Sequence, residues 1–151
     1  MKKNILLSAV LTVVFAAAFA TTVNKPMNIR LTIKGLEGST MILANYFGDK
    51  QYVKDTFDLD KKGSITFKAD TTFPGGVYLA VFPALGNRYF EFIINESSFS
   101  IETDSSDLTG HIKVTNSVEN TFFYDDMKFL GRMKATSDSL NKLYRDAKEQ
   151  K

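Results

Sequence analysis

The 151-residue sequence contains no cysteine and no tryptophan, and it has a single histidine. The lack of cysteine excludes disulfide bonds, thiol nucleophiles, zinc sites with cysteine ligands and cysteine-linked lipid anchors. A single histidine leaves little room for catalysis by a histidine acid or base. The residue inventory therefore indicates no catalytic activity, no cofactor and no metal centre.

The charge balance argues against a nucleic-acid partner. There are 19 basic and 17 acidic residues, a formal net charge of +2 with a calculated pI of 8.7. Lys2 and Lys3 lie in a segment that we expect to be removed, and 17 basic residues then remain against 17 acidic ones. Hydrophobic residues make up 44% and charged residues 24%, which is ordinary for one globular domain.

The first 20 residues, MKKNILLSAVLTVVFAAAFA, have the layout of a secretory signal peptide. Two lysines precede an uncharged apolar stretch, and Ala18-Phe19-Ala20 places small residues where a signal peptidase cleaves. The alternative is a membrane anchor, although the apolar stretch is short for a spanning helix, which needs about 20 apolar residues. We expect export to the periplasm or cell envelope, with membrane contact only before cleavage. No cysteine follows the apolar stretch, so a lipoprotein is not expected.

Residues 21–27 are predicted to be a linker, and residues 28–116 a β-rich domain. Apolar residues there alternate with polar ones, as in Ile29, Leu31 and Ile33, which predicts strands with one buried face. Val53, Phe57 and Leu59 are expected to share a face. Turn-forming residues separate about eight such runs, which favours an antiparallel β-sandwich or a partly open barrel.

Some runs depart from simple alternation, and some phenylalanines mark the core. Residues 41–47 and 77–82 are apolar on both faces, so they are expected to be the most covered strands. The phenylalanines expected in the core are Phe57, Phe67, Phe90, Phe92 and Phe99.

Residues 117–151 are predicted to form one long helix after an N-cap at Asn116. Phe122, Phe129 and Met133 recur at helical spacing and are expected to dock on the sandwich, and contact with a partner is the alternative. The second half is more polar, and neither Gly nor Pro closes it. We therefore expect a truncated chain or a linker into a further segment.

Four stretches of the sequence resemble a known family when taken in order. They are IRLTIKGLEGSTMILANYFGDKQYVKDTFDLDKKGSITFKA, FPGGVYLAVFP, NRYFEFIINESSFSIETD and HIKVTNSVENTFFYDDMKFL. In this order they resemble the N-terminal domain of unknown function that precedes a TlpA-like thioredoxin domain in exported bacterial thiol–disulfide oxidoreductases. The resemblance implies an accessory sandwich, a linking helix and an envelope location in a Gram-negative bacterium. The family's chemistry resides in a CxxC pair, which this chain lacks, so no catalytic residue carries over.

Two groups of loop residues have a functional alternative to a structural interpretation. Asp58, Asp60 and Gly63 in DLDKKG faintly resemble a calcium loop, but a hairpin turn is favoured. Asp104 and Asp107 suit a solvated loop better than a cation site or an acid/base pair.

The remaining polar candidates are weaker still. His111 is expected to be exposed and without a Ser or Asp partner. Asn95-Glu96-Ser97 matches a glycosylation sequon, but an asparagine in a turn explains this match. Glu91 has no motif around it that would support a hydrolase.

Four tyrosines form a candidate binding surface. Tyrosine on an exposed sheet face can hold a peptide or a sugar ring, and the alternative is a place in the core or at its rim. The four are Tyr46, Tyr52, Tyr78 and Tyr89. The expected function is a non-catalytic accessory domain that recruits a client protein or holds a thioredoxin domain. A free-standing envelope module for peptide or glycan is the alternative.

Overall fold

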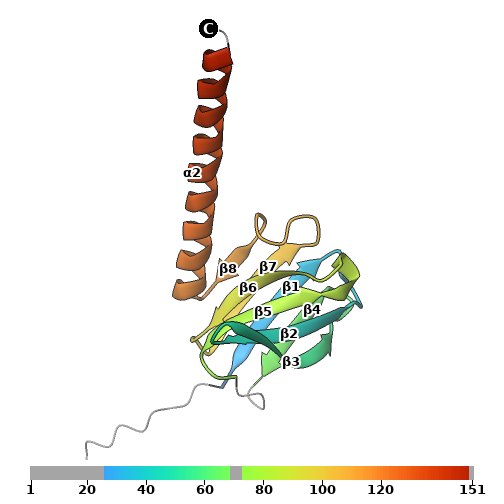
Figure 1. Cartoon of the computed structure of the whole chain (residues 1–151). Helices are drawn as coiled ribbons and strands as arrows, with labels where there is room; N and C mark the ends of the chain where they lie inside the picture. The colour runs from blue at the N-terminus through green and yellow to red at the C-terminus, as the bar shows by residue number, and fades with distance from the viewer. Residues whose placement is uncertain (1–25, 69–72, 150–151) are drawn as a thin grey trace, which may run out of the picture.

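The structure is a computed structural model, and it describes residues 26–68 and 73–149. The predicted signal peptide, residues 1–20, lies outside the described residues. In the described part, eight strands form two sheets and one long helix follows them (Figure 1). The strands are β1 (Asn28–Lys34), β2 (Thr40–Phe47), β3 (Lys50–Asp58), β4 (Ser64–Lys68), β5 (Gly76–Phe82), β6 (Arg88–Ile94), β7 (Ser98–Asp104) and β8 (Lys113–Thr115).

The two sheets stack as a sandwich, which confirms the predicted fold class. The first sheet has the order β4-β1-β7-β8 and the second sheet has the order β3-β2-β5-β6. Neighbouring strands are antiparallel except β1 and β7, which are parallel. The sequence predicted antiparallel pairing alone. Alternation identifies strands but not their neighbours, and β1 and β7 are far apart in the chain.

The core lies between the two sheets and is built from the alternating residues that the sequence indicates. Ile29, Leu31 and Ile33 of β1 are fully buried. Four of the five predicted core phenylalanines are buried, and Phe57 is partly buried and packs edge-on against Phe67 at 5.1 Å between ring centroids. Each buried apolar side chain of this size stabilises the fold by roughly 1.5–3 kcal/mol. The strands predicted to be most covered, β2 and β5, are the two central strands of the second sheet.

One strand face differs from the sequence prediction because β3 is irregular. The register between β2 and β3 shifts between Leu43 and Ala44, where Leu43 lies opposite Asp55 and Ala44 lies opposite Val53. Such a bulge inserts one residue and reverses the alternation beyond it. Val53 therefore points outward with 69% of its surface exposed, whereas Phe57 points to the core. The predicted common face of these two residues is wrong.

The helix α2 (Val118–Glu149) begins one residue later than the predicted cap requires. Asn116 has a left-handed backbone with φ of 61°, and Ser117 caps the helix instead. The Asn120 amide donates to Ser117 Oγ at 3.1 Å. Glu96, in the turn between β6 and β7, accepts hydrogen bonds from the Val118 amide at 2.8 Å and from Ser117 Oγ at 2.6 Å. A carboxylate at this end also interacts favourably with the helix dipole.

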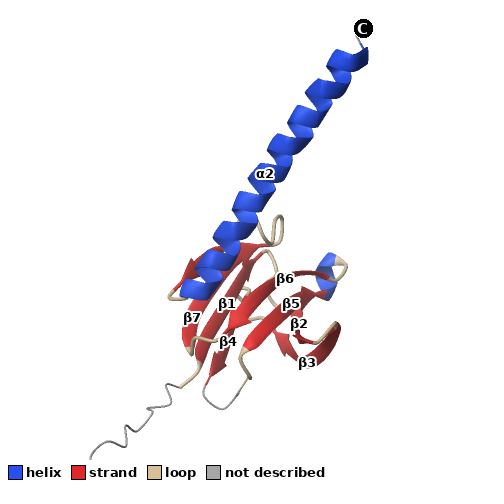
Figure 2. Ribbon diagram, turned by 60° about the vertical axis from the view of Figure 1, so that its left-hand side comes forward, coloured by secondary structure: helices blue, strands red, loops and turns tan. Residues whose placement is uncertain are grey.

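Only the first two turns of α2 pack on the sandwich. Asn120 and Tyr124 are its buried residues, and they lie against the free edge of β6. The helix then extends away from both sheets (Figures 1 and 2). Phe122, Phe129 and Met133 are exposed, so the predicted docking of this stripe on the sandwich is wrong. Within the described residues, no helix combines the length and the apolarity that crossing a membrane requires.

Candidate functional site: the outer face of the second sheet

The two outer faces of the sandwich differ in chemistry. On the first sheet, the residues that alternate with the core are polar or charged: Arg30, Thr32, Lys34, Thr66, Lys68, Ser100, Glu102, Lys113 and Thr115. On the second sheet, polar outward residues lie along β3 and at the start of β2: Thr40, Gln51, Thr56 and Asp58. The other outward residues of this sheet are apolar or aromatic apart from Glu91: Ile42, Ala44, Tyr46, Val53, Val77, Leu79, Val81, Tyr89, Glu91 and Ile93. We call this last set the outer apolar face.

The outer apolar face is centred on a contact that crosses β5. Tyr46 on β2 donates its hydroxyl hydrogen to Glu91 Oε1 on β6 at 2.7 Å. Gln51 Nε2 on β3 donates to the same tyrosine oxygen at 3.1 Å. The hydrogen bond to the Glu91 carboxylate holds the pKa of Tyr46 above its ordinary value. Three strands thus contribute to one hydrogen-bonded group on the surface.

The Tyr46–Glu91 contact also explains a buried leucine on an outer face. Leu79 of β5 lies opposite Glu91 on one side and Ala44 on the other. The side chains that meet across β5 leave only 1% of Leu79 exposed. Around them Ile42, Val77, Val81 and Ile93 stay partly exposed. The face is therefore a fixed apolar surface with one anchored polar group, an arrangement typical of protein–protein contact surfaces.

The structure separates the four tyrosines that the sequence grouped. Tyr46 and Tyr89 lie on the outer apolar face, and Tyr89 exposes 46% of its surface. Tyr52 lies near the end of the β2–β3 hairpin and packs edge-on against Phe47, with ring centroids 6.4 Å apart.

Tyr78 does not belong to the proposed surface. It is 1% exposed in the core, and its hydroxyl donates to the Pro74 carbonyl oxygen at 2.8 Å. Burial raises the pKa of this phenol. The core interpretation holds for Tyr78, and a binding role for it is wrong.

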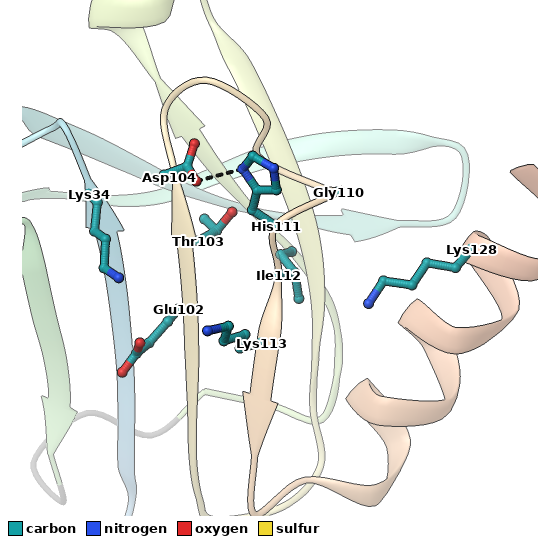
Figure 3. Close-up of a pocket in the computed structure, with 9 residues that line it drawn as sticks. All are labelled: Lys34, Glu102, Thr103, Asp104, Gly110, His111, Ile112, Lys113 and Lys128. Atoms are coloured by element: carbon teal, nitrogen blue, oxygen red, sulfur yellow. Dashed lines mark hydrogen bonds and ion pairs between the residues drawn. The ribbon is translucent and has the colours of Figure 1, made fainter.

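A second, polar surface lies at the loop between β7 and β8. Asp104 Oδ2 is 2.6 Å from Nδ1 of His111, although the sequence indicated no Asp partner for that histidine (Figure 3). A cleft of about 550 Å³ lies beside the pair. It is lined mainly by polar residues, which include Lys34, Glu102, Lys113 and Lys128 (Figure 3).

The two aspartates of this loop hold the loop itself. Asp104 accepts hydrogen bonds from the hydroxyl and the amide of Ser106, and Asp107 accepts one from the Gly110 amide at 2.9 Å. The Ser106 hydroxyl, with further help from the Asp107 amide and His111, lowers the pKa of Asp104 to about 2. The pKa of Asp107 is also lowered, chiefly by the Gly110 amide. A general acid needs a raised pKa, so both residues suit a structural role in the loop.

The Asp104–His111 pair does not extend to a nucleophile. The Ser106 hydroxyl bonds to Asp104 rather than to the imidazole. A serine relay requires the hydroxyl on the histidine. The pair therefore joins the end of β7, at Asp104, to the part of the loop that leads into β8, at His111.

The DLDKKG segment is a turn, but it is not a hairpin. It connects β3 of the second sheet to β4 of the first, and these strands do not pair. Asp60 Oδ1 accepts hydrogen bonds from the Lys62 and Ser64 amides at 2.7 and 2.9 Å, and these bonds lower the pKa of Asp60. Its oxygen is thereby used within the turn. In the described part of the chain, no group of three potential metal ligands gathers.

The sequon asparagine also has a structural contact. Asn95 Nδ2 donates to Glu119 Oε1 of α2 at 2.7 Å. Together with Glu96, it joins the turn after β6 to the start of the helix.

Glu91 and Gln51 are the residues of the site that sequence reasoning missed as partners of Tyr46. The signal in the sequence is the apolar character of residues 41–47 and 77–82 on both faces, which predicts strands covered on both sides. In the structure the second apolar face of these strands is the outer apolar face.

Comparison with known proteins supports a family but no activity. The model of a family described as a domain of unknown function, DUF4369, matches residues 27–123. This range contains all the described strands and the start of α2 as far as Phe123. Among curated proteins, nothing matches this chain.

One matching solved structure is that of 5-hydroxyisourate hydrolase from Klebsiella pneumoniae. The two chains are 16% identical, the match covers 60% of this chain and 99% of that chain, and the TM-score is 0.41. This level of similarity supports no statement about substrate or activity.

Proposed function

This chain belongs to the DUF4369 family of domains of unknown function, and from that premise we propose that it is a non-catalytic, exported recruiting module. It binds a partner polypeptide through the outer apolar face. The observation that carries the proposal is the contrast between the polar outer face of the first sheet and the apolar, tyrosine-bearing outer face of the second. An apolar face of this kind in water is typical of a contact surface.

The lack of cysteine limits what the module contributes. Thiol–disulfide exchange needs a thiolate, and the sequence contains none. This chain resembles the domain that precedes a TlpA-like thioredoxin domain, and a thioredoxin domain of that kind would carry the thiols that disulfide exchange needs. In this proposal the thioredoxin domain exchanges disulfides, and the present module raises the local concentration of client polypeptides. The basic and apolar layout of the first 20 residues supports an envelope location.

The outer apolar face suits an unfolded or partly folded client. Its apolar side chains would accept exposed apolar residues, and the tyrosines offer rings with a polar end. Tyr46 is held by Glu91 and Gln51, so little side-chain entropy is lost when a ligand packs on it. The exposed ring of Tyr89 is the observation that favours the alternative of a free-standing peptide or glycan module.

The test uses the full chain placed ahead of a TlpA-like thioredoxin domain that carries a CxxC pair. Reduction of an unfolded, disulfide-bonded client is followed with and without the module. The module is expected to lower KM while kcat stays unchanged, because it binds the client and does not take part in the exchange. The chain alone is expected to give no turnover.

The outer apolar face is tested by a matched pair of variants. Val53→Lys places a charge on that face, and Thr115→Lys places the same charge on the outer face of the first sheet. The native side chains of Val53 and Thr115 are both exposed, so neither substitution buries a charge. Val53→Lys is expected to abolish part or all of the KM effect, and Thr115→Lys is expected to leave it intact. Equal KM values with and without the module would refute the proposal, as would equal effects of the two variants.

A further inference from the structure

The second half of α2 carries an exposed apolar seam. After Tyr124, no residue of the helix is buried. Beyond that point Met127 exposes 41% of its surface, and six further large apolar side chains expose half or more: Phe129, Leu130, Met133, Leu140, Leu143 and Tyr144. Both views show this part of the helix well away from the sandwich (Figures 1 and 2).

The spacing along this seam is that of a coiled coil. From Phe129 the residues on one side follow at intervals of four and three: Phe129, Met133, Thr136, Leu140, Leu143 and Ala147. An alternation of four and three keeps one stripe facing a second helix over several turns. Gly131, Asp138 and Arg145 lie on the opposite side, where a charge or a glycine does not disturb the contact.

We propose that α2 pairs with α2 of a second copy of this chain as an antiparallel coiled coil. The register that matches the seam places Met133 opposite Leu143 of the second copy and Thr136 opposite its Leu140. Each such contact occurs twice, because the two copies are related by a twofold axis. The helix dipoles then run in opposite directions, which is favourable at both ends.

The residues that flank the seam select the antiparallel direction. In this register Arg132 lies beside Asp146 of the second copy, and this pair of opposite charges occurs on both halves of the contact. On the other flank Leu130 lies beside Tyr144 of the second copy. A parallel pair would instead place Asp126, which continues the seam toward the sandwich, against Asp126 of the second copy.

The area is sufficient for a weak specific dimer. Six large side chains per helix each expose on the order of 100 Å², so pairing would remove roughly 1,000–1,200 Å² from water, the lower range of specific interfaces. The antiparallel direction places the two sandwiches at opposite ends of the helix pair. The outer apolar face on each copy stays accessible, so the dimer and the recruiting function are independent.

The oligomeric state is tested on the full chain, expressed from Met1 in a Gram-negative host and checked by mass spectrometry. Sedimentation equilibrium is expected to show a reversible change from one chain to two as concentration rises. Leu140→Asp charges the seam, and Asn141→Asp places the same residue at the neighbouring outward position. Leu140→Asp is expected to raise the dimer Kd at least about 30-fold, and Asn141→Asp to change it little. A single-chain mass at every concentration would overturn the proposal, as would equal effects of the two variants.

The direction is tested by introducing one cysteine at a time, since the chain has none of its own. Ser139→Cys brings the two introduced thiols together at the twofold axis of an antiparallel pair. Met133→Cys brings them together only in a parallel pair, because in the antiparallel register they lie about ten residues, or roughly 15 Å, apart. Oxidation is expected to cross-link Ser139→Cys and not Met133→Cys. The reverse result would establish a parallel pair and overturn the proposed register.

Discussion

Asn120 of α2 completes the free edge of the second sheet as if it were a strand residue. Its Nδ2 donates to the Ile93 carbonyl oxygen at 2.8 Å, and its Oδ1 accepts from the Ile93 amide at 2.8 Å. Asn120 is fully buried, and its Nδ2 also donates to Ser117 Oγ at 2.9 Å. One side chain therefore satisfies both backbone groups of an edge residue and fixes the helix to the sandwich.

We predict that Asn120→Leu destabilises the protein by about 2–4 kcal/mol, because two backbone groups of Ile93 lose their partners in a buried place. Urea denaturation followed by circular dichroism measures the change in the free energy of unfolding. Asn141→Leu is the matched control, since that asparagine is exposed on the same helix, and it is expected to change stability by less than about 0.5 kcal/mol. Similar losses for the two variants would show that the Asn120–Ile93 contact contributes little.

The pH dependence of stability is predicted from Glu96, which caps α2. Burial is the largest single influence and raises the pKa of Glu96, but hydrogen bonds from Ser117, the Glu119 amide and the Val118 amide together outweigh it and hold the pKa below 4.5. A carboxyl group with a lowered pKa in the folded state stabilises the protein above its unfolded pKa. That contribution is lost as the pH falls through the folded pKa.

Glu96→Gln tests this sign. The amide removes the charge at every pH, so the variant is expected to be less stable than the native chain at pH 7 and to approach it as the pH falls below 4.5. Urea denaturation at pH 7 and at pH 3 measures the difference. Glu149→Gln, at the other end of the same helix, serves as the control and should show no such convergence. A gap that stays constant between the two pH values would contradict a charged cap.

The sequence was sufficient for the strands and for most of the core, because alternation follows directly from the geometry of a strand. Ile29, Leu31 and Ile33 are buried as their spacing predicts. The sequence was not sufficient to predict which strands pair with one another. The parallel pairing of β1 with β7 and the bulge beside Leu43 depend on contacts between segments that are distant in the chain.

The candidate site was predictable only in part, for the same reason. Residue type alone makes Tyr46 and Tyr89 candidates for a binding surface together with Tyr52 and Tyr78, and it does not separate the exposed tyrosines from those in the core or at its rim. The contact between Tyr46 and Glu91 joins residues 45 positions apart across an intervening strand, and no local pattern predicts it. The prediction that Phe129 and Met133 dock on the sandwich fails because helical spacing shows that a face is apolar but does not show what packs on it.

Gly38 and Gly63 have the same backbone conformation but different surroundings. Replacing each of them by alanine therefore separates the cost of a steric clash from the cost of placing a Cβ in a left-handed conformation. Gly63 and Gly38 both have φ of +68°, a region that other L-residues rarely adopt. A Cβ on Gly63 would lie 2.2 Å from the Ile33 carbonyl oxygen, whereas a Cβ on Gly38 would meet nothing within 4 Å. The Gly63 carbonyl oxygen also accepts a hydrogen bond from the Ile33 amide at 2.8 Å, which holds the two backbones together.

We predict that Gly38→Ala costs about 1–2 kcal/mol, the cost of placing a Cβ in a left-handed conformation. Gly63→Ala is expected to cost at least about 2 kcal/mol more, because the turn must also move away from β1 and strain its hydrogen bond to Ile33. The free energies of unfolding in urea give the comparison, and amide exchange at Ile33 shows whether that bond has opened. If the two variants lose the same stability and Ile33 stays protected, the close approach of the turn to β1 does not constrain this fold.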